Sequence, residues 1–70
     1  MAIERVTLAN ARRIAGMTQA ELAERLDLSV GTISSWETYK TEPTVSQAIK
    51  AAQAVGREYD EIIFLPENTV

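Results

Sequence analysis

The chain has 70 residues, a formal net charge of −3, and neither cysteine nor histidine. This composition excludes a disulfide framework and the usual zinc sites, so a helical core or self-association has to stabilise so short a chain. No apolar run approaches the roughly 20 residues that span a bilayer, and the first residues lack the pattern of a signal peptide. We therefore expect a cytoplasmic protein with no membrane partner.

A first helix is predicted over residues 8–15, "LANARRIA". Thr7 precedes it and can cap its free backbone N–H groups, and Gly16 suits the left-handed residue that follows many helices. Before Thr7, Ile3 and Val6 lie three residues apart, which does not fit the alternation of a strand, and the run is too short to predict a helix. We therefore expect residues 1–6 to be extended or loosely ordered.

The clearest helix is "TQAELAERL", residues 18–26. Thr18 and Glu21 have the spacing of a capping box, in which each side chain accepts a hydrogen bond from the other residue's backbone. Asp27 follows where a tight turn needs positive φ, and Asp is among the few residues other than glycine that tolerate it.

A third helix, "VGTISSWE" (residues 30–37), is predicted to begin after a Ser29 cap. Ile33 and Trp36 lie three residues apart and are expected to face the core. A base-stacking role for Trp36 is the alternative, and its spacing favours the core.

Thr44 is predicted to cap a fourth helix, "VSQAIKAAQAV", which Gly56 ends. Its expected core-facing residues are Val45, Ala48, Ile49, Ala52 and Val55. The following "YDEIIFL" is a short helix or an extended segment, and residues 66–70 are expected to be loosely ordered. The fold class is thus all-α, a compact four- to five-helix bundle.

Two short helices joined by about four residues, the second one Ser-capped, have the layout of a helix-turn-helix. The sequence resembles the phage repressor and Cro-type helix-turn-helix family, through Arg12, "GMTQAELAERL" (16–26), "LSVGTISSWE" (28–37) and "AIKAAQAVGREYDEIIF" (48–64). The resemblance implies one lambda-repressor-like domain over residues 1–70. It also implies a transcriptional regulator whose third helix lies in the major groove of a double-stranded DNA operator.

The resemblance assigns roles to individual residues. Gln19 matches a glutamine that contacts a phosphate from the start of the second helix. The positions that match base-facing residues are Val30, Gly31, Thr32, Ser34 and Ser35. The positions that match a loop on the flanking DNA backbone are Thr38, Tyr39 and Lys40. Arg12 and Glu37 match an internal ion pair.

Several of these residues have plainer interpretations. Gln19 can be ordinary helix surface. Glu37 can be imagined as a catalytic acid, but an ion pair with Arg12 is the better explanation. For Tyr39, a solvated side chain and a phosphate-contacting hydroxyl remain equally open.

The chain departs from the family pattern in two places. The family usually has glycine where this chain has Tyr39, and the loop holds Lys40 as its single basic residue beside Glu42. The base-facing positions also lack Arg, Lys, Asn and Gln, the residues that discriminate bases with paired hydrogen bonds. Recognition would therefore depend on shape, methyl contacts and close approach, and would need a second half-site bound by a homodimer.

The charge distribution leaves two functions open. Residues 1–41 hold five basic and five acidic side chains, whereas residues 42–70 hold two basic and five acidic ones and account for the whole −3. A DNA-binding regulator fits the motif best. The alternative is a protein-binding modulator, an anti-repressor or co-repressor that uses the same face or "IIFLP" to bind a partner repressor. Without histidine, cysteine or a glycine-rich phosphate loop, we expect no enzyme, cofactor or metal site.

Overall fold

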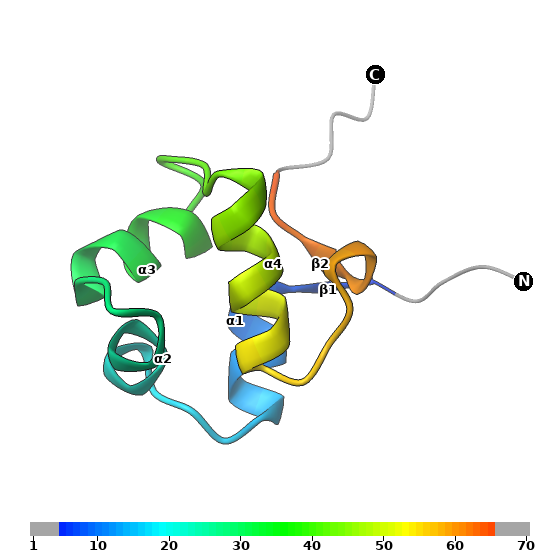
Figure 1. The fold of residues 1–70 in the computed structure, drawn as a ribbon, viewed down its shortest axis with the longest axis horizontal. Helices are drawn as coiled ribbons and strands as arrows, with labels where there is room; N and C mark the ends of the chain where they lie inside the picture. The colour runs from blue at the N-terminus through cyan, green and yellow to red at the C-terminus, as the bar shows by residue number, and fades with distance from the viewer. Residues whose placement is uncertain (1–4, 66–70) are drawn as a thin grey trace, which may run out of the picture.

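The computed structural model describes residues 5–65, and these contain four α-helices, one 3-10 helix and two very short strands. In chain order the elements are β1 (Val6–Thr7), α1 (Leu8–Ile14), α2 (Gln19–Leu26), α3 (Val30–Glu37), α4 (Val45–Ala54), η1 (Tyr59–Glu61) and β2 (Ile62–Ile63). Figure 1 shows α2 and α3 together on one side of α4, and the strands on its other side. The expected all-α fold is confirmed.

All four α-helices begin in the same way. A threonine or serine hydroxyl accepts a hydrogen bond from the backbone N–H three residues further on, which satisfies one of the unpaired donors of the first turn. These caps are Thr7, Thr18, Ser29 and Thr44, as the sequence predicted. Two of them also form complete capping boxes, with Glu21 in α2 and Gln47 in α4.

All four helices also end in the same way, at a residue with positive φ. These residues are Gly16 (75°), Asp27 (58°), Tyr39 (61°) and Gly56 (75°). The next backbone N–H then donates to a carbonyl five residues earlier, in the pairs Met17–Arg12, Leu28–Ala23, Lys40–Ser35 and Arg57–Ala52, at 2.8–3.0 Å. This is the Schellman arrangement, and it explains why the helices are short.

The core lies where α1, α2, α3 and α4 meet. Leu22 and Ile33 are completely buried, and Trp36 is 4% exposed, so the expected core role of Trp36 is confirmed. On α4, however, the prediction was wrong for two residues, because Val45 is 66% exposed and Ile49 is 40% exposed. The inward side of α4 consists of Ala48, Ala51, Ala52 and Val55. Alanines let the other helices approach closely, and Val45 and Ile49, four residues apart, share a neighbouring face.

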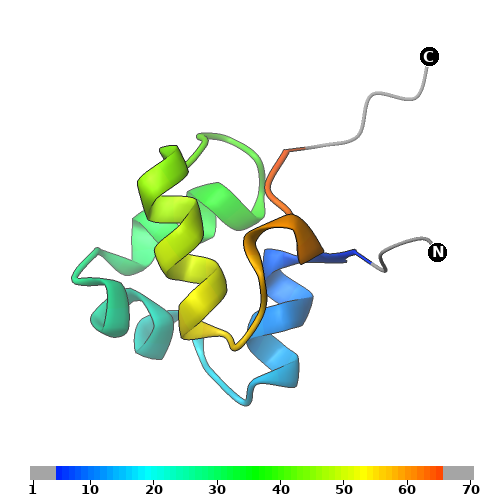
Figure 2. The same cartoon turned by 45° about the vertical axis from the view of Figure 1, so that its right-hand side comes forward.

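The two ends of the described chain pair with each other. Val6 lies opposite Ile62 and Thr7 opposite Ile63 in a parallel arrangement, and Figure 2 shows this pair beside α1. Arg5 Nε adds a hydrogen bond to the Asp60 carbonyl at 3.3 Å. Val6 is thus ordered, although we expected a loose segment up to position 6, and the expected loose residues 1–4 and 66–70 lie outside the described part. No helix between residues 5 and 65 is long and apolar enough to cross a membrane.

Candidate nucleic-acid interface

The turn between α2 and α3 is determined by Asp27, which ends α2, and Ser29, which begins α3. Asp27 adopts the left-handed conformation (φ 58°, ψ 45°), and its N–H donates to the carbonyls of the last turn of α2. Ser29 then caps α3 by accepting from the Thr32 N–H at 3.2 Å. Three residues therefore change the chain direction between two helices that pack directly against each other.

A buried hydrogen-bond network joins α1, α2 and α3 through one carboxylate. Arg12 donates from Nε to Glu37 Oε2 at 2.7 Å and from Nη2 to Glu37 Oε1 at 3.2 Å. Gln19 Nε2 donates to the same Oε1 at 2.9 Å. The third guanidinium nitrogen of Arg12, Nη1, donates to the Met17 carbonyl at 2.7 Å. The structure thus brings Arg12, Gln19 and Glu37 into one cluster.

Because its charged groups are buried, this cluster constrains how α1, α2 and α3 are placed relative to one another. The side chains of Arg12 and Glu37 are 9% and 5% exposed, and no buried side-chain nitrogen or oxygen of the described residues lacks a hydrogen-bond partner. A two-bond Arg–carboxylate pair has a fixed relative orientation. It therefore sets the start of α2 and the end of α3 relative to α1, while its net stabilisation is small because both charges are desolvated.

Gln19 has a role that the sequence did not indicate. It is the first residue of α2 and is half-buried, and its amide nitrogen is bonded to Glu37. A glutamine amide has two N–H donors and an acceptor oxygen, so one N–H can still point to a phosphate. No sequence pattern marks this contact, because 18 residues separate the two side chains.

Of the five positions predicted to face bases, four share the side of α3 opposite Ile33 and Trp36. Val30 is 45% exposed, Gly31 is exposed, and Ser34 and Ser35 are half-buried. Thr32 lies at the edge of this face, and its hydroxyl is 2.9 Å from the Ser29 hydroxyl, so it also belongs to the helix cap.

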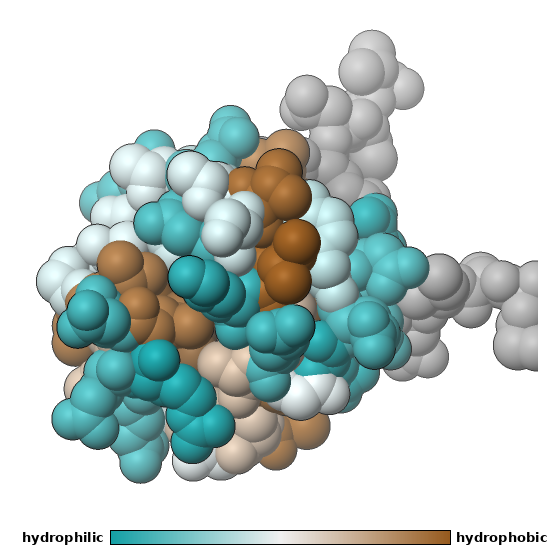
Figure 3. All heavy atoms as spheres, viewed as in Figure 1, coloured by the Kyte–Doolittle hydropathy of each residue, from teal (hydrophilic) through white to brown (hydrophobic). Residues whose placement is uncertain are grey.

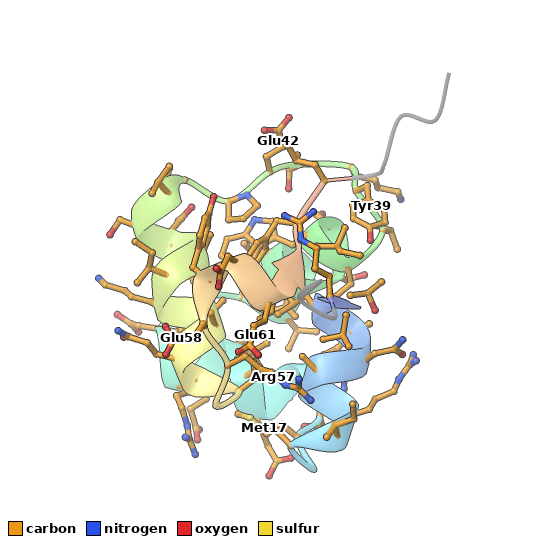
Figure 4. The ribbon with its side chains drawn as sticks, turned by 90° about the vertical axis from the view of Figure 1, so that its right-hand side faces the viewer. Met17, Tyr39, Glu42, Arg57, Glu58 and Glu61 are labelled. Carbon is orange, nitrogen blue, oxygen red and sulfur yellow. The ribbon has the colours of Figure 1, made fainter. Side chains whose placement is uncertain are left out.

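The loop after α3 contains the remaining predicted contacts. The Thr38 hydroxyl donates to the Ser34 carbonyl at 2.8 Å, while Tyr39 (37% exposed) and Lys40 face solvent. Figure 4 shows Tyr39 and Glu42 at one end of the molecule, far from the charged group Arg57, Glu58 and Glu61. Because φ of Tyr39 is 61°, the loop follows the path for which the family uses glycine. A side chain in this conformation carries strain of about 1–2 kcal/mol.

One acidic group lies close to the candidate phosphate contact. The pKa of the Glu21 carboxyl is lowered, mainly because the Thr18 backbone N–H donates to it at 2.8 Å, and also through the Thr18 side chain and the charge of Arg25. Glu21 therefore keeps a negative charge in the first turn of α2. No group of three His, Cys, Asp or Glu side chains that could hold a metal ion occurs among the described residues.

Comparisons with known proteins match the same region. The helix-turn-helix family matches residues 8–62, which include all four α-helices. A protein of Methanothermobacter thermautotrophicus, named as an uncharacterized HTH-type transcriptional regulator, is 41% identical over 54 residues. The match covers 77% of this chain and 78% of that protein. No solved structure matches the chain.

Proposed function

Because the chain belongs to the helix-turn-helix family, we propose that it is a sequence-specific, DNA-binding transcriptional regulator of the phage repressor and Cro type. In this proposal α3 lies in the major groove and α2 crosses the DNA backbone. The observation that carries it is the hydrogen-bonded Arg12–Glu37–Gln19 cluster, which holds the start of α2 and the end of α3 in one fixed relation.

The contacts divide into those that position the protein and those that read bases. At the start of α2, Gln19 and the free N–H groups of the first turn bind one phosphate, where the helix dipole favours a negative charge. Thr38, Tyr39 and Lys40 contact the backbone on the other side of the groove. Such contacts fix register, and base-edge contacts from α3 supply specificity. Since Glu37 already orients Gln19, less side-chain freedom is lost on binding.

Two copies of the protein bind one operator in this proposal. The base-facing positions of α3 are Val30, Gly31, Thr32, Ser34 and Ser35, and none of them makes a paired hydrogen bond to a base, so one half-site binds weakly. The exposed Val45 and Ile49 form an apolar stripe on α4, which Figure 3 shows as brown surface along that helix. A homodimer that uses this stripe would bind two half-sites, which for helix-turn-helix dimers lie about one helical turn apart.

A titration against a labelled duplex library, at low and at moderate salt, tests the function. We expect enrichment of a palindromic sequence and an affinity that falls with salt, with a slope proportional to the number of phosphates contacted. Equal binding to all sequences at both salt concentrations would contradict the proposal.

A second candidate function is favoured by the surface around η1 and β2. Tyr59 and Leu65 are 46% and 50% exposed there, beside an open groove of about 330 Å³. A protein-binding modulator would bind a partner repressor through this apolar surface and prevent its DNA contacts. A footprint that changes only when both proteins are present would support this function. Protection of a palindromic operator by the isolated chain would exclude it as the main one.

A further inference from the structure

Gly31 has no role in the fold that glycine alone can fill. Unlike Gly16 and Gly56, it does not have positive φ, and an added Cβ would meet only the Ser29 hydroxyl oxygen, at an ordinary 3.8 Å. Glycine destabilises a helix relative to alanine. Gly31 thus costs helix stability without a packing reason. Its missing side chain leaves a gap at the surface, on the face of α3 that points away from the core.

Val30, beside it, is the large apolar side chain that α3 exposes, at 45%. The Thr32 hydroxyl forms a hydrogen bond with the Ser29 hydroxyl, and the Thr38 hydroxyl donates one to the Ser34 carbonyl. The hydroxyls of Ser34 and Ser35, also on this face, form no hydrogen bond with another residue between positions 5 and 65. The face therefore presents one branched hydrocarbon group beside a gap, with two short hydroxyls.

We propose that Val30 recognises the 5-methyl group of thymine in the operator, and that Gly31 provides the close approach which makes this contact possible. In the major groove this methyl group distinguishes a T·A pair by apolar contact alone. A valine at the first position of α3 reaches a base edge only if the helix backbone lies deep in the groove, and the missing side chain at Gly31 permits that depth. The inference rests on the proposed function, in which α3 lies in the major groove.

Replacing single thymines of the selected operator by deoxyuridine tests the methyl contact, because deoxyuridine lacks the methyl group and keeps every hydrogen-bonding group. We expect one position in each half-site at which the wild-type affinity falls about fourfold, the effect of one methyl group withdrawn from water. For Val30→Ala this loss should nearly vanish. Ile14→Ala, which shortens an exposed isoleucine on α1, serves as the control and should keep the full loss.

Gly31→Ala tests the close approach with two readouts that move in opposite directions. We expect a higher Tm, because alanine favours the helix, together with operator affinity at least tenfold lower. Gly16→Ala is the matched control, since positive φ there predicts a lower Tm and unchanged affinity measured well below that Tm.

The outcomes separate this inference from the proposed function. An operator that is bound specifically but is insensitive to deoxyuridine at every position, or Val30→Ala with the wild-type loss, would overturn the inference alone. Wild-type affinity in Gly31→Ala would overturn its close-approach part. Absence of any sequence preference would overturn the proposed function and the inference together.

Discussion

At the scale of single residues, Arg12 connects α1 both to α3 and to the loop before α2. Its guanidinium contacts Glu37 at the end of α3 and the Met17 carbonyl in the loop before α2. Arg13, the next residue, is exposed, and within residues 5–65 its guanidinium donates a hydrogen bond only to the Asn10 side chain, at 3.5 Å. Two adjacent arginines of one helix thus have unrelated roles, which makes them a matched pair for mutation.

We expect Arg12→Met to lower the free energy of unfolding by about 3–5 kcal/mol, because it leaves the Glu37 carboxylate buried without its partner. This approaches the whole stability of a small domain. The milder Glu37→Gln, which keeps an amide oxygen, should therefore be measured in parallel, with an expected loss of about 1–3 kcal/mol. Urea denaturation measures both, and Arg13→Met is the control. Equal losses for Arg12→Met and Arg13→Met would show that Arg12→Met does not leave Glu37 as a buried, unpaired charge.

Tyr39 offers a mutation that should stabilise the protein. Tyr39→Asn keeps a side chain but tolerates the left-handed conformation, so the free energy of unfolding should rise by up to about 1 kcal/mol. Lys40→Asn, at an exposed neighbour without positive φ, should give no gain. A loss of stability in Tyr39→Asn would mean that the packing of the tyrosine outweighs its strain.

The same substitution decides between the two interpretations of Tyr39. Weaker operator binding would identify a phosphate contact, and unchanged binding would identify a solvated side chain.

At the scale of the helix, the capping boxes of α2 and α4 differ in a single property. In α2 the box ends in Glu21 and in α4 it ends in Gln47, and both accept from the cap residue's backbone N–H at 2.8 Å. Only the carboxylate adds a charge, which the N-terminal end of the helix dipole favours. The geometry is therefore shared, while only the α2 box depends on pH.

Folding lowers the pKa of Glu21, so the stabilisation that its charge provides is present above the ordinary glutamate pKa. It is lost as the pH falls through the lowered value in the folded state. We expect wild type to exceed Glu21→Gln in free energy of unfolding at neutral pH, with a difference that shrinks as the solution is acidified through that range. Gln47→Glu should create the same pH dependence in α4. A difference between wild type and Glu21→Gln that is constant with pH would contradict this cause.

At the scale of the whole molecule, local features were predictable from the sequence pattern. Contacts between distant segments were not, apart from the Arg12–Glu37 ion pair that the family resemblance implied. Caps such as Thr18 and Ser29 act within one turn, so a short sequence window contains all the required information. On α4 two apolar stripes compete, and whether Val45 and Ile49 or the alanines face inward depends on the size of the space that the other helices leave. The bond between Gln19 and Glu37, and the pairing of β1 with β2, join residues 18 and 56 positions apart. These two contacts depend on how the helices pack, and a pattern within a short stretch of sequence does not predict that packing.

The apolar stripe of Val45 and Ile49 limits how strongly two copies can associate. Stable protein interfaces bury about 1,200–2,000 Å², far more than two side chains from each partner provide. A dimer held by this stripe should therefore be weak in solution and form on DNA, where two neighbouring half-sites raise the effective concentration of one copy beside the other. Two copies then associate when both are bound to neighbouring half-sites of the operator, and not in free solution.

We accordingly expect a monomer in sedimentation at micromolar concentration and cooperative binding to an operator with two half-sites. Ile49→Glu places a charge in the stripe on each copy, so it should abolish cooperativity by like-charge repulsion and lost apolar contact. Binding to an isolated half-site should change little. Ile14→Glu adds the same charge at an exposed isoleucine of α1, so it should leave cooperativity intact. If Ile49→Glu binds the two half-sites as cooperatively as wild type, the copies meet through another surface. If Ile14→Glu removes cooperativity instead, that surface includes α1.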